Sequence, residues 1–255
     1  MKVTILGCGT SSGVPRIGNE WGSCDPAEPR NRRTRASILV ETETTRLLVD
    51  TSPDMREQLL TANVTDLTAV LWTHDHADHC HGIDDLRQIF HFRGSPVPGY
   101  ARRQTLDHLR RRFQYVFDGR DGYPATVNPH ILPDELVIGD ILIRCVDQPH
   151  GDIYSTGFRF EYDGKSISYS TDFHKFTNDM HRLFSGTDIW VVDALRERPH
   201  PTHTHLALTL GAIQSVQPGQ AILTHMDQSM DYAHLLRTLP EGVVPGFDGM
   251  TVEIK

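Results

Sequence analysis

Three histidines and an aspartate lie within six residues, just after an apolar run. The run Leu67–Trp72 ends before Thr73, and the next potential metal ligands are His74, His76, Asp78 and His79. Neutral imidazoles and carboxylates are the ligands that zinc, manganese and iron take in proteins. Taken alone, the motif is also compatible with a histidine-rich loop that binds metal adventitiously. We interpret it as a metal site at the end of a strand, and hence as the centre of a metal-dependent hydrolase.

Three further candidate ligands each follow another strand-like stretch, and they are His150, Asp172 and His225. Singly, an aspartate in such a place is often a turn or cap residue, and a lone histidine is usually a solvated loop residue. Together with the first motif they give seven potential ligands. That number is enough for two metal ions.

The order of these motifs resembles the metallo-β-lactamase superfamily: His-x-His-x-Asp-His, then a single histidine, a single aspartate and a last histidine. The resemblance spans nearly the whole chain. It implies two divalent ions, zinc or manganese, in two ligand sets: His74, His76 and His150 for one ion, and Asp78, His79 and His225 for the other. It also implies that Asp172 bridges the two ions, and that a bridging hydroxide completes the pair and attacks the substrate. Catalytic roles are therefore expected for Asp78 and Asp172.

Five further segments are similar to one branch of that superfamily, the phosphodiesterases related to phosphoribosyl 1,2-cyclic phosphate phosphodiesterase. They are Thr4–Pro15, Trp21–Pro26, Gly82–Arg87, Pro199–His203 and Gly246–Met250. In that relative several cysteines and a histidine bind a structural zinc after the first of these segments. Here only Cys24 remains in that loop, and the other three cysteines fit no Cys-x-x-Cys spacing. A third metal site is therefore not expected.

A phosphodiesterase must also protonate the oxygen that leaves, and the histidine-rich run Pro199–His205 is the natural source of that proton. Resemblance places the active-site histidine of the branch at His203. His205 is the second candidate, which we also expect to bind substrate, and His200 is the third. The alternative is that all three simply lie exposed in a proline-rich loop.

Donors for a phosphate group are expected in two places. Ser11 and Ser12 lie in a glycine-rich turn after the first strand, where backbone N–H and hydroxyl groups can bind an anion, although such a turn is also a common flexible connection. Arg87 lies on the helix that follows the metal-binding motif and is the third candidate. The arginine-rich tract 102–112 is a weaker one, because a basic helix face is usually solvated.

Composition agrees with one compact enzyme of α/β class. The 255 residues are 38% hydrophobic, and we expect a single domain, residues 1–255, with an αββα metallo-β-lactamase sandwich of two mixed sheets flanked by helices. No apolar run is long enough to span a membrane, and the start lacks a signal-peptide cleavage site. The four scattered cysteines predict a cytoplasmic location. The net charge of −8 makes nucleic acid an unlikely partner.

The chain divides into two half-chains that each build one sheet. Strands are predicted at 3–6, 37–41, 46–50 and 69–73, with helices at 53–61 and 81–90. Residues 94–133 are interpreted as a helical insertion near the active-site mouth, with a basic helix over 102–115. From Glu135 onward we expect strand pairs, including 155–162 and 166–170 joined by a turn at Asp163-Gly164. Helices at 177–184, 206–216 and 230–239 should cover the outer face.

Several functions compete. The leading hypothesis is a phosphodiesterase that opens a small cyclic ribose or nucleotide phosphate to a phosphomonoester. The second is an endoribonuclease similar to the tRNA 3′-processing enzymes, which share all seven ligands but hold tRNA with a long basic arm. Thioester or lactam hydrolysis is the third hypothesis. A non-catalytic metal-binding protein is the fourth, and it would be expected to lack some of the seven ligands. A homodimer is expected from resemblance alone.

Overall fold

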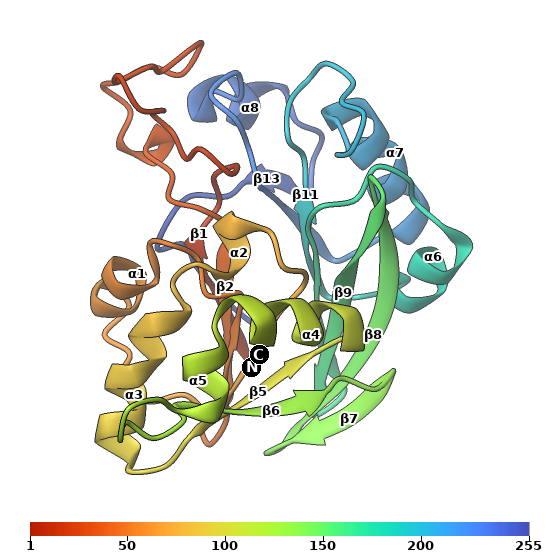
Figure 1. Cartoon of the computed structure of the whole chain (residues 1–255). Helices are drawn as coiled ribbons and strands as arrows, with labels where there is room; N and C mark the ends of the chain where they lie inside the picture. The colour runs from red at the N-terminus through yellow and green to blue at the C-terminus, as the bar shows by residue number, and fades with distance from the viewer. Residues whose placement is uncertain (255) are drawn as a thin grey trace.

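The computed structural model describes residues 1–254, which form two sheets packed face to face with helices on both outer sides (Figure 1). The first sheet has the order β14-β1-β2-β3-β4-β5-β6. Its strands are β1 (Lys2–Gly7), β2 (Ser37–Glu41), β3 (Arg46–Val49), β4 (Ala69–Leu71), β5 (Val97–Ala101), β6 (Val127–Ile131) and β14 (Thr251–Glu253). The second sheet has the order β13-β12-β11-β10-β9-β8-β7. Its strands are β7 (Glu135–Ile138), β8 (Ile141–His150), β9 (Ile153–Tyr162), β10 (Lys165–Ser170), β11 (Ile189–Asp193), β12 (Gln220–Thr224) and β13 (Val243–Pro245).

Both sheets are mixed, as predicted. The strands β14, β1, β2 and β3 pair antiparallel, whereas β3 to β6 pair parallel. In the second sheet β10 to β13 pair parallel and β7 to β10 antiparallel. The expected αββα sandwich is confirmed.

Helices cover each sheet on its outer face. The first half carries α1 (Met55–Thr61), α2 (Ala77–Cys80), α3 (Leu86–Arg93), α4 (Arg103–Arg112) and α5 (Gln114–Asp118), with short 3-10 turns η1 (Pro29–Asn31) and η2 (Ile83–Asp85). The second half carries α6 (Asn178–Phe184), α7 (Leu206–Val216) and α8 (Tyr232–Thr238). None of the helices in the described residues is long and apolar enough to cross a membrane.

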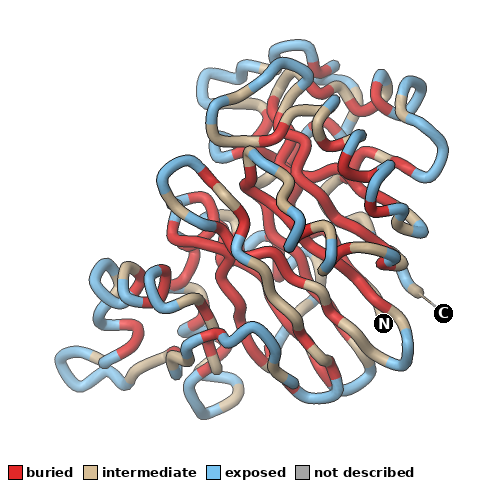
Figure 2. Tube along the Cα trace, turned by 90° about the vertical axis from the view of Figure 1, so that its right-hand side faces the viewer, coloured by how far each residue is buried: buried red, intermediate tan, exposed pale blue. Residues whose placement is uncertain are grey.

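Alternating side chains on the inner strands explain the layers. In β2, Ile38 and Val40 belong to the core between the two sheets, whereas Leu39 belongs to the core beneath α1 and α3. In β3, Leu47 belongs to the core between the sheets, and Leu48 belongs to the core beneath α1 and α3. Successive strand residues point to opposite faces, so a strand that is covered on both sides must be apolar throughout. Figure 2 shows that buried residues gather in the extended segments at the centre, whereas exposed residues lie mostly in the surrounding segments.

Three expectations about the first half were wrong in detail. The stretch 94–133 is not entirely helical, because its two ends form β5 and β6 and only residues 103–118 form helices. Both strands contain a proline, which obscures a strand pattern, and β6 tolerates its proline because it is an edge strand. The helix predicted over 102–115 breaks at Phe113, where φ is −120° and ψ is 40°. The helix predicted over 81–90 is divided into η2 and α3.

Candidate metal centre

The seven predicted ligands meet at one edge of the sandwich. The loop after β4 carries His74, β8 ends at His150, and Asp172 and His225 follow β10 and β12. The strands β10, β11 and β12 are parallel neighbours, so their carboxyl ends lie at the same edge. Asp172 and His225 both have a positive φ, at 55° and 57°, a backbone conformation that is strained for residues other than glycine and is often found at functional sites.

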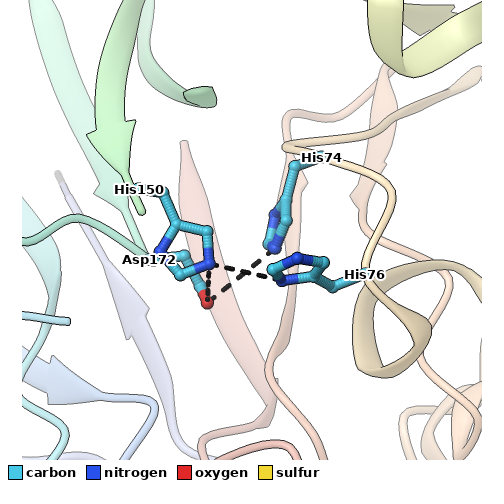
Figure 3. Close-up of side chains that lie close together, drawn as sticks. All are labelled: His74, His76, His150 and Asp172. Carbon is cyan, nitrogen blue, oxygen red and sulfur yellow. Dashed lines mark hydrogen bonds and ion pairs between the residues drawn. The ribbon is translucent and has the colours of Figure 1, made fainter. Parts of the chain in front are cut away.

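Three histidines and one aspartate form the first cluster (Figure 3). His150 Nε2 lies 3.3 Å from His76 Nδ1 and 3.6 Å from Asp172 Oδ1. His74 Nε2 lies 3.9 Å from the same carboxylate oxygen. One atom of each side chain therefore faces a common point, and all four atoms lie within 4.8 Å of one another.

The second cluster lies on the other side of Asp172 and contains Asp78, His79 and His225. His79 Nε2 is 3.2 Å from Asp78 Oδ2 and 3.2 Å from Asp172 Oδ2. His225 Nε2 is 3.5 Å and 3.6 Å from the same two oxygens. Asp172 thus presents Oδ1 to the first cluster and Oδ2 to the second.

Polar atoms without hydrogen-bond partners indicate that the clusters suit cations. The Nε2 atom of His74 is buried and has no hydrogen-bond partner, which is costly unless something else occupies the space that it faces. The opposite ring nitrogens are held in place. Their partners are Thr73 Oγ1 for His74, Asp50 Oδ2 for His79 and the Thr202 carbonyl for His150. Such contacts fix the imidazole orientation that divalent metals require, so the residues fit divalent metal ions.

Burial favours neutral imidazoles in the first cluster. It lowers the pKa of His74 well below its ordinary value, with a further contribution from the neighbouring His79. Burial likewise lowers the pKa of His76 and of His150. At neutral pH this cluster therefore offers three unprotonated rings, the form that binds metal.

In the second cluster, the carboxylates determine the direction of the histidine pKa shifts. Burial disfavours a charged ring at His225, but Asp172 and the nearby aspartates outweigh it and raise the pKa of His225 to about 9. The same balance raises the pKa of His79 well above its ordinary value. Burial also opposes ionisation of Asp172, yet the neighbouring histidines, led by His225, hold its pKa well below the usual range. A cation that enters this cluster therefore displaces protons.

Two buried aspartates complete the centre, and neither was identified from the sequence. Asp50, directly after β3, accepts from the Thr73 backbone N–H and hydroxyl, both at 2.8 Å, and contacts His79 Nδ1 at 2.7 Å. Asp193, the last residue of β11, accepts from the Asp172 backbone N–H at 3.0 Å. Both follow the pattern of an acidic residue at the end of an apolar strand, which was the available signal.

The histidine run 199–205 lies beside both clusters. His203 Nδ1 is 3.4 Å from Asp193 Oδ2 and 3.6 Å from Asp172 Oδ1, and its ring stacks on His225 with centroids 5.0 Å apart. His200 packs edge-on against His203 at 5.1 Å. His205 instead takes the N-cap position of α7, and no hydrogen bond or ion pair links its side chain to the clusters. Among the three candidates, His203 has the most direct contact with the centre.

The predicted phosphate donors are placed in two different regions. Ser11 and Ser12 are exposed in a turn whose neighbour Thr10 donates its backbone N–H to the carbonyl of Met226, the residue after His225. This turn therefore adjoins the metal centre. Arg87 lies on α3 and lines a separate cavity that contains none of the cluster residues.

Comparisons with known proteins agree with the fold. The model of the β-lactamase superfamily domain matches residues 45–226. The solved structure of a new diphosphatase from the PhnP family superposes with a TM-score of 0.91 and 32% sequence identity, over 100% of this chain and 98% of that one.

Two curated relatives align with this chain over only about half of their own length. An octanoyltransferase of Porphyromonas gingivalis is 31% identical over 257 residues, which are 98% of this chain and 51% of the relative. A ribonuclease Z of Bradyrhizobium sp. is 31% identical over 137 residues, which are 52% of this chain and 46% of the relative. The chain thus spans about half the length of either protein.

Proposed function

Since the chain belongs to the metallo-β-lactamase superfamily and is a PhnP-like, metal-dependent hydrolase, we propose that it hydrolyses a small cyclic ribose or nucleotide phosphodiester to a phosphomonoester. The observation that carries the proposal is the position of Asp172, whose two oxygens face two separate clusters of ligands. Two divalent ions, zinc or manganese, held in this way supply a nucleophile from water at neutral pH and polarise the oxygens of a phosphodiester. We propose His74, His76 and His150 as ligands of one ion and Asp78, His79 and His225 as ligands of the other.

His203 is the residue that we assign to the leaving group. Its Nδ1 faces Asp193 and Asp172, so Nε2 is left to donate a proton to the departing ribose oxygen. A ribose alkoxide leaves poorly at neutral pH, and general acid assistance is typically worth about 10²- to 10⁴-fold. Asp193 orients the imidazole, and it also holds the backbone of Asp172.

Hydrolysis of a diphosphate bond is the second candidate. The observation in its favour is the 32% identity and full-length superposition with a diphosphatase of the PhnP family. A diphosphate also presents a phosphorus atom with non-bridging oxygens to the centre, so the same residues would serve both reactions. The two substrates differ in the leaving group, because a phosphate leaves readily without a proton donor.

RNA processing has less support. Three of the five arginines in the tract 102–112 are already ion-paired: Arg102 with Asp134 and Asp147, Arg110 with Asp118, and Arg112 with Asp75. These pairs leave little uncompensated positive charge for a polynucleotide backbone. We therefore propose a small-molecule substrate rather than nucleic acid. A cytoplasmic location is proposed from the scattered cysteines, and a homodimer from the family resemblance alone.

The test is phosphorus NMR of the manganese-loaded protein with three substrates: 5-phosphoribosyl 1,2-cyclic phosphate, 2′,3′-cyclic AMP and a dinucleoside diphosphate. Asp172→Ala is the control, because it removes both carboxylate oxygens that face the clusters. Ring opening that disappears in the control supports the proposal and identifies the preferred ring. Cleavage of the diphosphate alone would favour the second candidate, and no turnover of any of the three would refute both.

A further inference from the structure

A second cavity of about 550 Å³ lies between α3, α5 and the loop 119–126. The two helices are adjacent at the lower left of Figure 1, below α2. None of the residues that line the cavity belongs to the metal clusters or to the histidine run. Its volume falls within the range of small-molecule sites, about 300–1,000 Å³. The proposed hydrolysis does not use it.

Aromatic rings form much of the cavity wall. Phe90 comes from α3, Tyr115 from α5, and Tyr123 from the loop. Tyr123 is 68% exposed and Tyr115 is 39% exposed, so both rings are accessible to a ligand from solvent. The guanidinium of Arg87 lies 5.6 Å from the centre of the Tyr123 ring. These faces suit a flat heteroaromatic ring, which stacks on aromatic and guanidinium planes.

The acidic residues in the lining already have hydrogen-bond or ion-pair partners. Asp84 accepts a hydrogen bond of 2.6 Å from the Tyr115 hydroxyl, and Asp121 pairs with Arg120 at 3.2 Å. Burial, with a contribution from Asp84, raises the pKa of Tyr115 to about 12, so this hydroxyl remains a donor.

Arg87 is different from the other charged residues of the lining. Within residues 1–254 no carboxylate lies within ion-pair distance of it, and its nearest polar contact is His91 Nε2 at 3.5 Å. The cavity therefore presents one uncompensated guanidinium beside aromatic faces. A guanidinium is well suited to hold the oxygens of a phosphate group through paired hydrogen bonds.

We propose that this cavity binds a nucleoside monophosphate, with its base against Tyr115 and Tyr123 and its phosphate on Arg87. The base and the phosphate are both needed for this contact set. Inorganic phosphate cannot stack on the tyrosine rings, and a nucleoside has no phosphate for the Arg87 guanidinium to bind. The site is separate from the metal centre and does not depend on the reaction catalysed there. It gives a role to Arg87 and to the loop 119–126.

Calorimetric titration of the metal-loaded protein with AMP tests the proposal, with adenosine and inorganic phosphate as comparison ligands. Arg87→Ala should weaken AMP binding about tenfold or more, the usual effect of losing a charge-assisted hydrogen bond. Tyr123→Leu should weaken AMP but not phosphate. Arg237→Ala is the matched control, because it removes an exposed arginine on α8 outside the cavity. All three positions are exposed, so the variants should fold.

Photolabelling with 8-azido-AMP locates the bound base independently. Trypsin separates residues 113–120, which carry Tyr115, and 121–144, which carry Tyr123, from the peptides that carry the metal ligands, and the label should appear on one or both. Several results would overturn the proposal: no AMP binding, equal affinity in wild type and Arg87→Ala, equal binding of inorganic phosphate, or label found only on peptides with metal ligands.

Discussion

Asp50→Asn should selectively weaken one of two metal sites. In the structure Asp50 Oδ2 lies 2.7 Å from His79 Nδ1, an arrangement in which the ring donates from Nδ1 and keeps Nε2 free to bind metal. Asp50 has two acceptor oxygens and contacts both His79 and the Thr73 backbone N–H. An asparagine has only one, and can turn it toward only one of these two groups. If the NH₂ group faces His79, the imidazole must accept at Nδ1 and carry its proton on Nε2, where metal would bind.

The expected effect can be estimated from that single contact. A hydrogen bond to a charged group is worth about 1.5–3 kcal/mol, and loss of such a supporting contact typically lowers metal affinity about 10- to 100-fold. The affinity for the ion held by Asp78, His79 and His225 should therefore fall by that factor. The affinity for the ion held by His74, His76 and His150 should fall much less, because Asp50 contacts none of these side chains directly and reaches only His74, through the Thr73 hydroxyl.

Calorimetric titration of the metal-free protein with zinc measures both equivalents in one experiment. Asp140→Asn is the matched control: Asp140 also accepts hydrogen bonds from threonine hydroxyls, at 2.8 and 2.9 Å, but lies in the turn between β7 and β8. If Asp50→Asn leaves both equivalents unchanged, or weakens both to the same extent, the assignment of Asp50 to His79 is wrong.

Three further substitutions test other parts of the structure. His203→Ala should keep metal content but slow release of a ribose oxygen about 10²- to 10⁴-fold, with a much smaller loss for a p-nitrophenyl ester; equal losses on both substrates would remove its role as a proton donor. Burial raises the pKa of Asp248 from 3.8 to about 6, so the stability that this residue contributes is fully present below about pH 4 and is lost as the pH rises through 6. The free energy of unfolding of wild type relative to Asp248→Asn should accordingly fall by up to about 3 kcal/mol over that window, and a difference that stays constant with pH would contradict the shift. Cys24→Ser should leave metal content unchanged, because Cys24 contacts the Arg33 guanidinium at 3.8 Å; loss of one metal equivalent on elemental analysis would restore the structural zinc site.

The side chains that meet in the two clusters could be predicted from the sequence because metal-ligand chemistry allows few residue types. His74 and the residues after it form a dense motif, and the later ligands each follow a strand. Asp50 and Asp193 could not be distinguished in the same way from an ordinary turn or cap aspartate. Each is a single aspartate at a strand end, and its role depends on a partner 20 or more residues away in the sequence.

The remaining errors came from segments where local sequence and tertiary context disagree. Val97–Ala101 contains Pro98 and Gly99, which lower its strand propensity, but pairing with β4 and β6 on both sides makes it a strand. Arg87 was expected near the active site because it follows the metal motif closely. The 3-10 turn η2 lies between the metal motif and α3, and Arg87 lines a cavity that contains none of the cluster residues.

We propose that two metal ions, one on each side of Asp172, act together on a phosphodiester. The most direct measurement is the rate of 2′,3′-cyclic AMP opening as manganese is added in steps to the metal-free protein, with bound metal determined at each step. We predict that activity remains low through the first equivalent, rises with the second, and is absent in Asp172→Ala. Full activity with one bound equivalent, or activity that survives in Asp172→Ala, would contradict the account.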